Sequence, residues 1–292
     1  MKKNLIILGF LLLLPALLLL LSGGCAVGNN ADDRLTVAVS IVPQAALIRE
    51  IAGDSINVVI LVPPGKSPEN YAPVPQDMEA LSRSALYFAI GVPAEESSIL
   101  PWLESGNKQA EIVDLAAAVR EVYPEREFSP GQRDPHIWLS PQRAALMAEI
   151  MAEKLAVADK KNSSTYRENA RRYIAELNDL DREIAAQYEG LNENTFIIYH
   201  PSLGYYADDY GLEMVAIEDE GKNASPADLQ RIIDLAREKK LKTVFYQAEH
   251  DSRQARTLAA EISGNAVQIN PLASDYIENL RDITAKITAS LQ

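Results

Sequence analysis

Cysteine is almost absent from this chain of 292 residues, in which Cys25 is the single example. One cysteine excludes an intrachain disulfide, so burial and hydrogen bonding must hold the fold together. Histidine is scarce too, with three residues, and basic residues are outnumbered by acidic ones, 28 to 41. Phosphate binding needs a basic face that this composition does not offer, which excludes nucleic acid as a partner. An acidic surface instead raises the local concentration of cations.

Several enzyme motifs are missing as well. The chain has no Walker loop, no GxSxG, no HExxH and no GxGxxG after its first strand-like run. These motifs mark nucleotide binding, serine hydrolysis, zinc proteolysis and dinucleotide binding. Their absence favours a binding protein over an enzyme.

The N-terminus has the features of a bacterial export signal. Two lysines precede an almost unbroken apolar run that ends at Leu21, and small residues then lead to Cys25. We predict that residues 1–25 form a signal peptide and lipobox, with Cys25 as the lipidated residue, and that residues 26–34 form a short polar tether. Loss of the two lysines would leave 26 basic against 41 acidic residues, a net charge of −15.

Strand-like apolar runs alternate with amphipathic stretches along the rest of the chain, which is typical of βαβ units and parallel sheets. We predict strands near residues 35–41, 56–62, 86–90 and 111–113 in the first half, and near 195–199, 213–217, 243–247 and 266–269 in the second. Helices are predicted near residues 44–52, 76–82, 141–158, 226–239, 252–262 and 276–291. A chain of this length exceeds the usual size of one core, so two lobes or one large α/β domain are the options.

A long helix is predicted between the halves, from Tyr166 to Tyr188, with Ser163 or Ser164 as its N-cap. Apolar side chains recur at spacings of three and four along this stretch, as one continuous stripe. At 1.5 Å per residue the helix would be roughly 35 Å long. That length is enough to run along both halves.

Two of the three histidines, His136 and His200, lie where a strand-like run passes into a loop, in DPHIWLSP and YHPSLGYY. Ligands of open α/β sheets collect beyond the carboxyl ends of strands, and neutral imidazole is the commonest protein ligand for transition metals. Glu69 and Asp275 place carboxylates beyond two further predicted strands. Each carboxylate also has a structural alternative, Glu69 as an exposed loop residue and Asp275 as the N-cap of the last helix.

Four segments in this order resemble the metal-binding solute-receptor lipoproteins of bacterial zinc and manganese ABC importers. They are LTVAVSIVPQAALIREIAGDSINVVILVPPGKSP, DPHIWLSP, HPSLGYY and VFYQAEHDSRQARTLAAEI, followed by a PL element near the end. The resemblance implies an α/β fold of two lobes, each with a roughly four-stranded, mostly parallel sheet flanked by helices, joined by one long helix. The lobes would be residues 35–160 and 191–292, and the joining helix would be residues 161–190.

The resemblance also implies a metal ion between the lobes, held by Glu69 and His136 from the first and by His200 and Asp275 from the second. The family usually has a histidine where this chain has Glu69. Two imidazoles with two carboxylates suit manganese or iron better than a three-histidine set does, although zinc also accepts them. His250 is at a position that the family seldom uses for metal, and we expect it beside the ligands or at the surface.

An extracytoplasmic receptor for zinc, manganese or iron follows from the resemblance. It would be a monomer and not an enzyme, anchored through Cys25 at the cell surface or in the periplasm, with the membrane permease of an ABC importer as its partner. Two alternatives remain open. A metal-dependent hydrolase can use the same ligands if one coordination position is left for water. An adhesin-like lipoprotein with a vestigial metal site would explain the loss of the family's first histidine.

Overall fold

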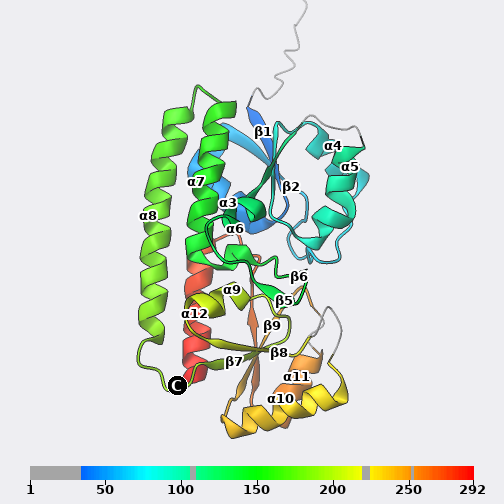
Figure 1. Ribbon diagram of the computed structural model, residues 1–292, viewed down its shortest axis with the longest axis vertical. Helices are drawn as coiled ribbons and strands as arrows, with labels where there is room; N and C mark the ends of the chain where they lie inside the picture. Colours follow the sequence, from blue (N-terminus) through cyan, green and yellow to red (C-terminus); the bar gives the residue numbers. More distant parts are fainter. Residues whose placement is uncertain (1–33, 106–109, 219–223, 251–252) are drawn as a thin grey trace, which may run out of the picture. The chain divides into compact units, whose positions relative to one another are not determined.

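The computed structural model describes residues 34–105, 110–218, 224–250 and 253–292. These residues form two four-stranded sheets in which all neighbouring strands are parallel (Figure 1). The strands are β1 (Leu35–Val39), β2 (Ile56–Ile60), β3 (Leu86–Ala89) and β4 (Glu111–Asp114), then β7 (Thr195–Ile198), β8 (Glu213–Ala216), β9 (Thr243–Gln247) and β10 (Asn265–Ile269). The predicted fold class is confirmed.

The longer helices also lie where the sequence places them. They are α3 (Val42–Ala52), α4 (Pro75–Ser82), α7 (Pro141–Ala158), α8 (Ser163–Tyr188), α10 (Pro226–Glu238), α11 (Arg253–Glu261) and α12 (Tyr276–Leu291). The predicted N-cap of α8 is wrong, because Asn162 precedes the helix and both Ser163 and Ser164 lie inside it.

The short elements were not predicted, because they have too few residues to show a periodic pattern. They are η1 (Gly53–Ser55), the π-helical turn η2 (Glu95–Ile99), α5 (Leu100–Glu104), α6 (Leu115–Arg120), the antiparallel pair β5 (Glu127–Ser129) and β6 (Gln132–Arg133), η3 (Ile137–Leu139) and α9 (Gly204–Asp209).

Both sheets have the same strand order. The first runs β2-β1-β3-β4 and the second runs β8-β7-β9-β10, so the first strand of each half lies between the second and the third. The direction of winding reverses at such a strand, and open α/β sheets bind ligands in the crevice beyond its carboxyl end. In the second sheet Ile198 is paired with Ala216, and continuing that register places His200 level with Glu218.

The long helix α8 is packed along α7 and also contacts α3 and α12, which belong to different halves of the chain (Figure 1). Its 26 residues span about 39 Å at 1.5 Å per residue. The stripe that it buries is Tyr166, Ala170, Tyr173, Leu177, Leu180 and Ile184. One buried apolar cluster extends from Val37 in β1 to Leu291 in α12, so packed side chains as well as a helix join the halves.

Within the described ranges, no helix combines the length and the apolar character that crossing a membrane requires. Residues 1–33, which contain Cys25 and nearly all of the predicted signal and tether, lie outside the described residues.

Candidate metal site

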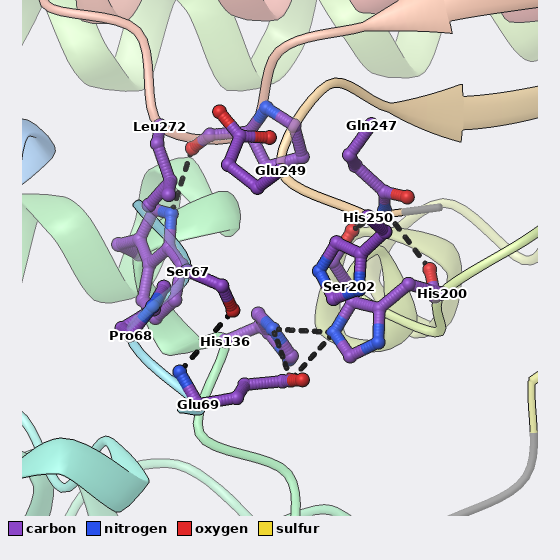
Figure 2. Close-up of a pocket in the computed structure, with 12 residues that line it drawn as sticks. Ser67, Pro68, Glu69, His136, His200, Ser202, Gln247, Glu249, His250 and Leu272 are labelled. Atoms are coloured by element: carbon purple, nitrogen blue, oxygen red, sulfur yellow. Dashed lines mark hydrogen bonds and ion pairs between the residues drawn. The ribbon is translucent and has the colours of Figure 1, made fainter. Parts of the chain in front are cut away.

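Three donor atoms from distant parts of the sequence converge between the two sheets. Oε1 of Glu69 lies 2.7 Å from Nε2 of His200 and 3.9 Å from Nε2 of His136, and the two Nε2 atoms are 3.3 Å apart. Figure 2 shows the three side chains turned toward one another. Donor atoms bonded to one tetrahedral zinc ion at about 2.0–2.2 Å are about 3.3–3.6 Å from each other. The observed separations bracket that range, so small shifts would let one ion bond to all three atoms.

Glu69 is presented by the loop that follows β2. Gly65 turns the chain with a φ of +78°, a conformation that residues with a side chain rarely adopt. The N–H of Glu69 then donates to Oγ of Ser67 at 3.3 Å, and the carbonyl of Pro68 accepts from the N–H of Ala94 at 2.9 Å. These bonds place the carboxylate at the cavity, where 23% of the side chain is exposed.

His136 is oriented by a carboxylate buried behind it. Oδ1 of Asp134 accepts from the backbone N–H of His136 at 2.9 Å and from its Nδ1 at 2.8 Å. With the proton on Nδ1, the lone pair of Nε2 is left for an ion. The ring also lies against the buried indole of Trp138, with centroids 5.1 Å apart. Nε1 of Trp138 donates to the carbonyl of Pro271 at 3.0 Å, which ties this segment to the second half.

Asp134 is linked to the second half by an arginine. Nε of Arg126 lies 3.3 Å from Oδ2 of Asp134, and Nη1 of Arg126 donates to both carboxylate oxygens of Asp208 in α9, at 2.8 and 2.7 Å. Gly204, the first residue of α9, makes this approach possible, because a Cβ there would overlap Arg126 and Asp134. The orientation of His136 therefore depends on residues of both halves.

His200 follows β7, and both its backbone and its ring have partners. Nε2 of Gln247 donates to the carbonyl of His200 at 3.0 Å, and Nδ1 of His200 donates to Oε2 of Glu218 at 2.9 Å. Glu218 follows the neighbouring strand β8 and is buried. A carboxylate on Nδ1 again leaves Nε2 for an ion, the arrangement that surrounds most metal-binding histidines.

The contact between Glu69 and His200 changes the pKa of both groups. Burial alone would lower the pKa of His200, but the hydrogen bonds and negative charges of Glu218 and Glu69 outweigh burial and raise it to about 9. Burial would raise the pKa of Glu69, yet the hydrogen bond and the charge of His200 hold it below its usual value. At neutral pH the two groups are an imidazolium and a carboxylate, and an ion would have to displace the proton that they share.

These side chains line a cavity of about 20 Å³. A cavity needs roughly 10–15 Å³ by this measure to hold one water molecule, so there is space here for one small ion. A larger cavity of about 480 Å³ adjoins it at Glu69, His200 and Glu218. His250 lies on the same wall, with its ring stacked on that of His200 at a centroid distance of 4.2 Å and an angle of 13°. Nδ1 of His250 is 3.7 Å from Oε2 of Glu218.

Three of the four predicted ligands meet at this cavity, and Asp275 does not. Asp275 accepts a hydrogen bond from the N–H of Glu278 at 3.4 Å as the N-cap of α12, which is the structural alternative that the sequence offered. It lines a separate cavity beside Tyr173. Pro271 and Leu272, from the same segment, reach the metal cavity in its place.

Two carboxylates that orient the histidines were not identified from the sequence. Glu218 follows a predicted strand, so the rule that selected Glu69 applied to it equally. Asp134 lies two residues before His136, and this proximity is the only sign of its role in the sequence.

The fold and the site define a class of protein: two α/β halves that hold one transition-metal ion between them by imidazole and carboxylate groups. Comparison with known proteins gives the family. The family model described as zinc-uptake complex component A, periplasmic, matches residues 37–290, and the chain belongs to this family of extracytoplasmic metal-binding components. The resemblance seen in the sequence is thereby confirmed.

The chain is similar to several named members. It is 26% identical to the zinc-binding lipoprotein AdcA of Streptococcus pneumoniae (strain ATCC BAA-255 / R6) over 90% of this chain, and it spans 55% of that protein's length. It is 27% identical to the iron ABC transporter substrate-binding lipoprotein MtsA of Streptococcus pyogenes (serotype M6, strain ATCC BAA-946 / MGAS10394), over 89% of this chain and 86% of that one. A crystal structure of ZnuA superposes with a TM-score of 0.84 and 34% identity, covering 89% of this chain and all of that one.

Proposed function

We propose that this chain captures a zinc, manganese or iron(II) ion with Glu69, His136 and His200 and delivers it to the membrane permease of an ABC importer. The observation that carries the proposal is the convergence of three donor atoms, two of them on rings whose Nδ1 is bonded to a buried carboxylate. Ligands supported in this way are held in place before the ion arrives, which lowers the cost of binding.

The donor set accepts all three metals, so the metal that is bound depends on which one is supplied. Two imidazole nitrogens and a carboxylate oxygen are acceptable to zinc, manganese and iron(II). The Irving–Williams order favours zinc at equilibrium. The names of the relatives point both ways, since AdcA is described as zinc-binding and MtsA as an iron transporter component.

The proposal includes the organisation expected from the sequence. Residues 1–25 would direct export and place a lipid on Cys25. Residues 26–34 would tether two lobes, residues 35–160 and 191–292, and the helix that joins them, residues 161–190. The protein would act as a lipid-anchored monomer outside the cytoplasmic membrane. The family match over residues 37–290 and the lipoprotein names of the relatives support this arrangement.

We infer that the site binds and does not catalyse. A metal hydrolase needs a base beside the bound water. Asp134 and Glu218 are bonded to histidine rings, which leaves Glu249 as the one other carboxylate among the described residues that line the cavity with Glu69. The family match over residues 37–290 also supports binding, because that family is a component of metal uptake. Nor does the site resemble a vestigial one, because Glu69 brings an oxygen atom to the place where the family's first histidine is missing.

Metal analysis of protein purified without chelators, followed by competition between zinc and manganese, tests the proposal. We expect one ion per chain and a rise in melting temperature, since a ligand at a hundredfold excess over its Kd stabilises the native state by about 2.7 kcal/mol. His136→Ala and His200→Ala should abolish the rise, while Asp275→Asn should keep it. A parent protein that neither contains nor responds to zinc, manganese or iron would refute the function.

A further inference from the structure

His250 is the remaining histidine of the cavity, and its geometry excludes it from the position between Glu69, His136 and His200. The rings of His200 and His250 are stacked 13° from parallel, with centroids 4.2 Å apart. An imidazole bonds to a metal ion through a lone pair that lies in the plane of the ring. An ion in the plane of the His200 ring therefore lies outside the plane of the His250 ring, and the two rings cannot bind the same ion in this arrangement.

His250 nevertheless belongs to a second set of donors. Ligand atoms of Glu69, His200, Glu218 and His250 lie within 4.8 Å of one another. Within this set Glu218 and Glu69 both contact the ring of His200, Glu218 through Nδ1 at 2.9 Å and Glu69 through Nε2 at 2.7 Å. The contact with Nε2 is the one that an ion displaces, so Glu69 and the ring of His250 are the groups of this set that can accept an arriving ion. Figure 2 shows the ring of His250 beside that of His200 on the wall of the cavity.

His250, which belongs only to the second set, is nearer to solvent than His136, which belongs only to the first. The side chains of Glu69 and His250 are 23% and 15% exposed, whereas those of His136 and His200 are 5% and 6% exposed. An ion that enters through the cavity lined by His250 meets Glu69 and His250 before it reaches the two buried rings. Because both positions use the carboxylate of Glu69, a single ion would occupy one of them at a time.

We propose that Glu69 and His250 form an outer, transient position through which a divalent transition metal passes on its way to Glu69, His136 and His200. Glu69 belongs to both positions, so the ion keeps one protein ligand while it exchanges water and His250 for the inner rings. This inference rests on the proposed function. It assigns His250 to the rates of metal capture and release and not to the affinity of the final complex.

Stopped-flow fluorescence with zinc as the probe tests the inference, because Trp138 lies against His136 and reports the inner position. Trp102→Phe, in every protein compared, leaves Trp138 as the single tryptophan. We expect His250→Asn to lower the association and dissociation rate constants together, each by at least fivefold, with Kd changed less than twofold. His250→Asp, which restores a metal ligand, should recover most of the association rate.

Other outcomes would overturn the inference. Unchanged rates in His250→Asn would show that the ion reaches the inner site without His250. A loss of affinity as large as that of His136→Ala would make His250 a permanent ligand. Glu249→Gln is the matched control at the same cavity, and an equal slowing there would assign the effect to the cavity rim in general. In each of these cases the parent protein still binds zinc, so the proposed function stands; a parent without binding would instead refute that function.

Discussion

Nε2 of His200 lies 2.7 Å from Oε1 of Glu69, and the two atoms share a proton at the place where an ion would bond to both. Proton and ion therefore compete for the same site. A rise in pH should therefore have opposite effects on the stability of the metal-free protein and on its affinity for metal, and both quantities can be measured.

The pKa of His200 is raised to about 9 from an ordinary value of 6.5. The metal-free protein should gain stability from this proton below pH 6.5 and lose it as the pH rises through 9. Metal affinity should change in the opposite direction, rising about tenfold per pH unit over the same interval, because one proton must leave. Calorimetry at pH 7 in two buffers of different ionisation enthalpy should show one proton released per zinc ion. An affinity independent of pH would contradict this account.

Substitution of Glu69 tests the proposed ligand at which this chain departs from its family. Glu69→Ala removes an oxygen donor and a negative charge, so it should weaken metal binding strongly, and manganese more than zinc. Glu69→His should restore binding and shift the preference toward zinc, since an added imidazole makes the donor set softer. Competition titrations with the two metals give both numbers. If both variants bind within a factor of about two of the parent, which is the scale of a surface change, Glu69 is not a ligand.

The sequence predicted the elements of this fold well because their patterns are local. Alternating apolar runs defined the strands, and the stripe from Tyr166 to Ile184 defined the buried face of α8. His136 and His200 could be selected because each combines a metal-binding side chain with a position after a strand-like run. Neither step required knowledge of which strands are neighbours.

The features of the site that the sequence did not reveal depend on the order of the strands and on the direction in which each loop leaves its sheet. Glu218 supports His200 because β8 is hydrogen-bonded to β7, and His250 reaches the same ring because β9 lies on the other side. Asp275 was placed at the cavity, but the segment after β10 reaches the cavity with Leu272 and has turned into α12 by Asp275. The residue that reaches the cavity lies three positions before the predicted one, and no periodic pattern in the sequence indicates such a difference along a loop.

The carboxylate behind His136 should control metal affinity without touching the ion. Asp134→Asn keeps the shape of the side chain but removes its charge, so it should weaken zinc binding by about 10- to 100-fold, as loss of such a partner usually does. Gly204→Ala should have a similar effect, because its Cβ would displace Arg126 and Asp134. Asp208→Asn, at the exposed end of the same chain of contacts, should weaken binding less than Asp134→Asn, because Arg126 keeps its contact with Asp134. Equal affinities in all three variants would show that Asp134 does not orient the ligand.

An ion pair between α7 and α9 should stabilise the fold only while both of its partners are present. Nη1 of Arg143 lies 2.8 Å from Oδ1 of Asp209, and the two side chains are 6% and 11% exposed. Asp209→Ala leaves a buried guanidinium without its counter-charge, which should lower the free energy of unfolding by about 3–5 kcal/mol. The exposed pair of Arg171 and Glu168 provides the control, and Glu168→Ala should cost less than about 1 kcal/mol.

The double substitution Arg143→Met with Asp209→Leu distinguishes a need for the pair from a need for its charges. Nε of Arg143 and Oδ2 of Asp209 are buried without hydrogen-bond partners, so the pair recovers only part of what it lost on leaving water. Apolar side chains of similar size avoid that loss, and the double variant should unfold at a higher urea concentration than Asp209→Ala alone. Urea denaturation of the metal-free proteins measures the difference. The contrary result is a loss of unfolding free energy in the double variant equal to the sum of the losses in the two single variants. The two side chains would then act independently, and the ion pair would not be the source of the stability.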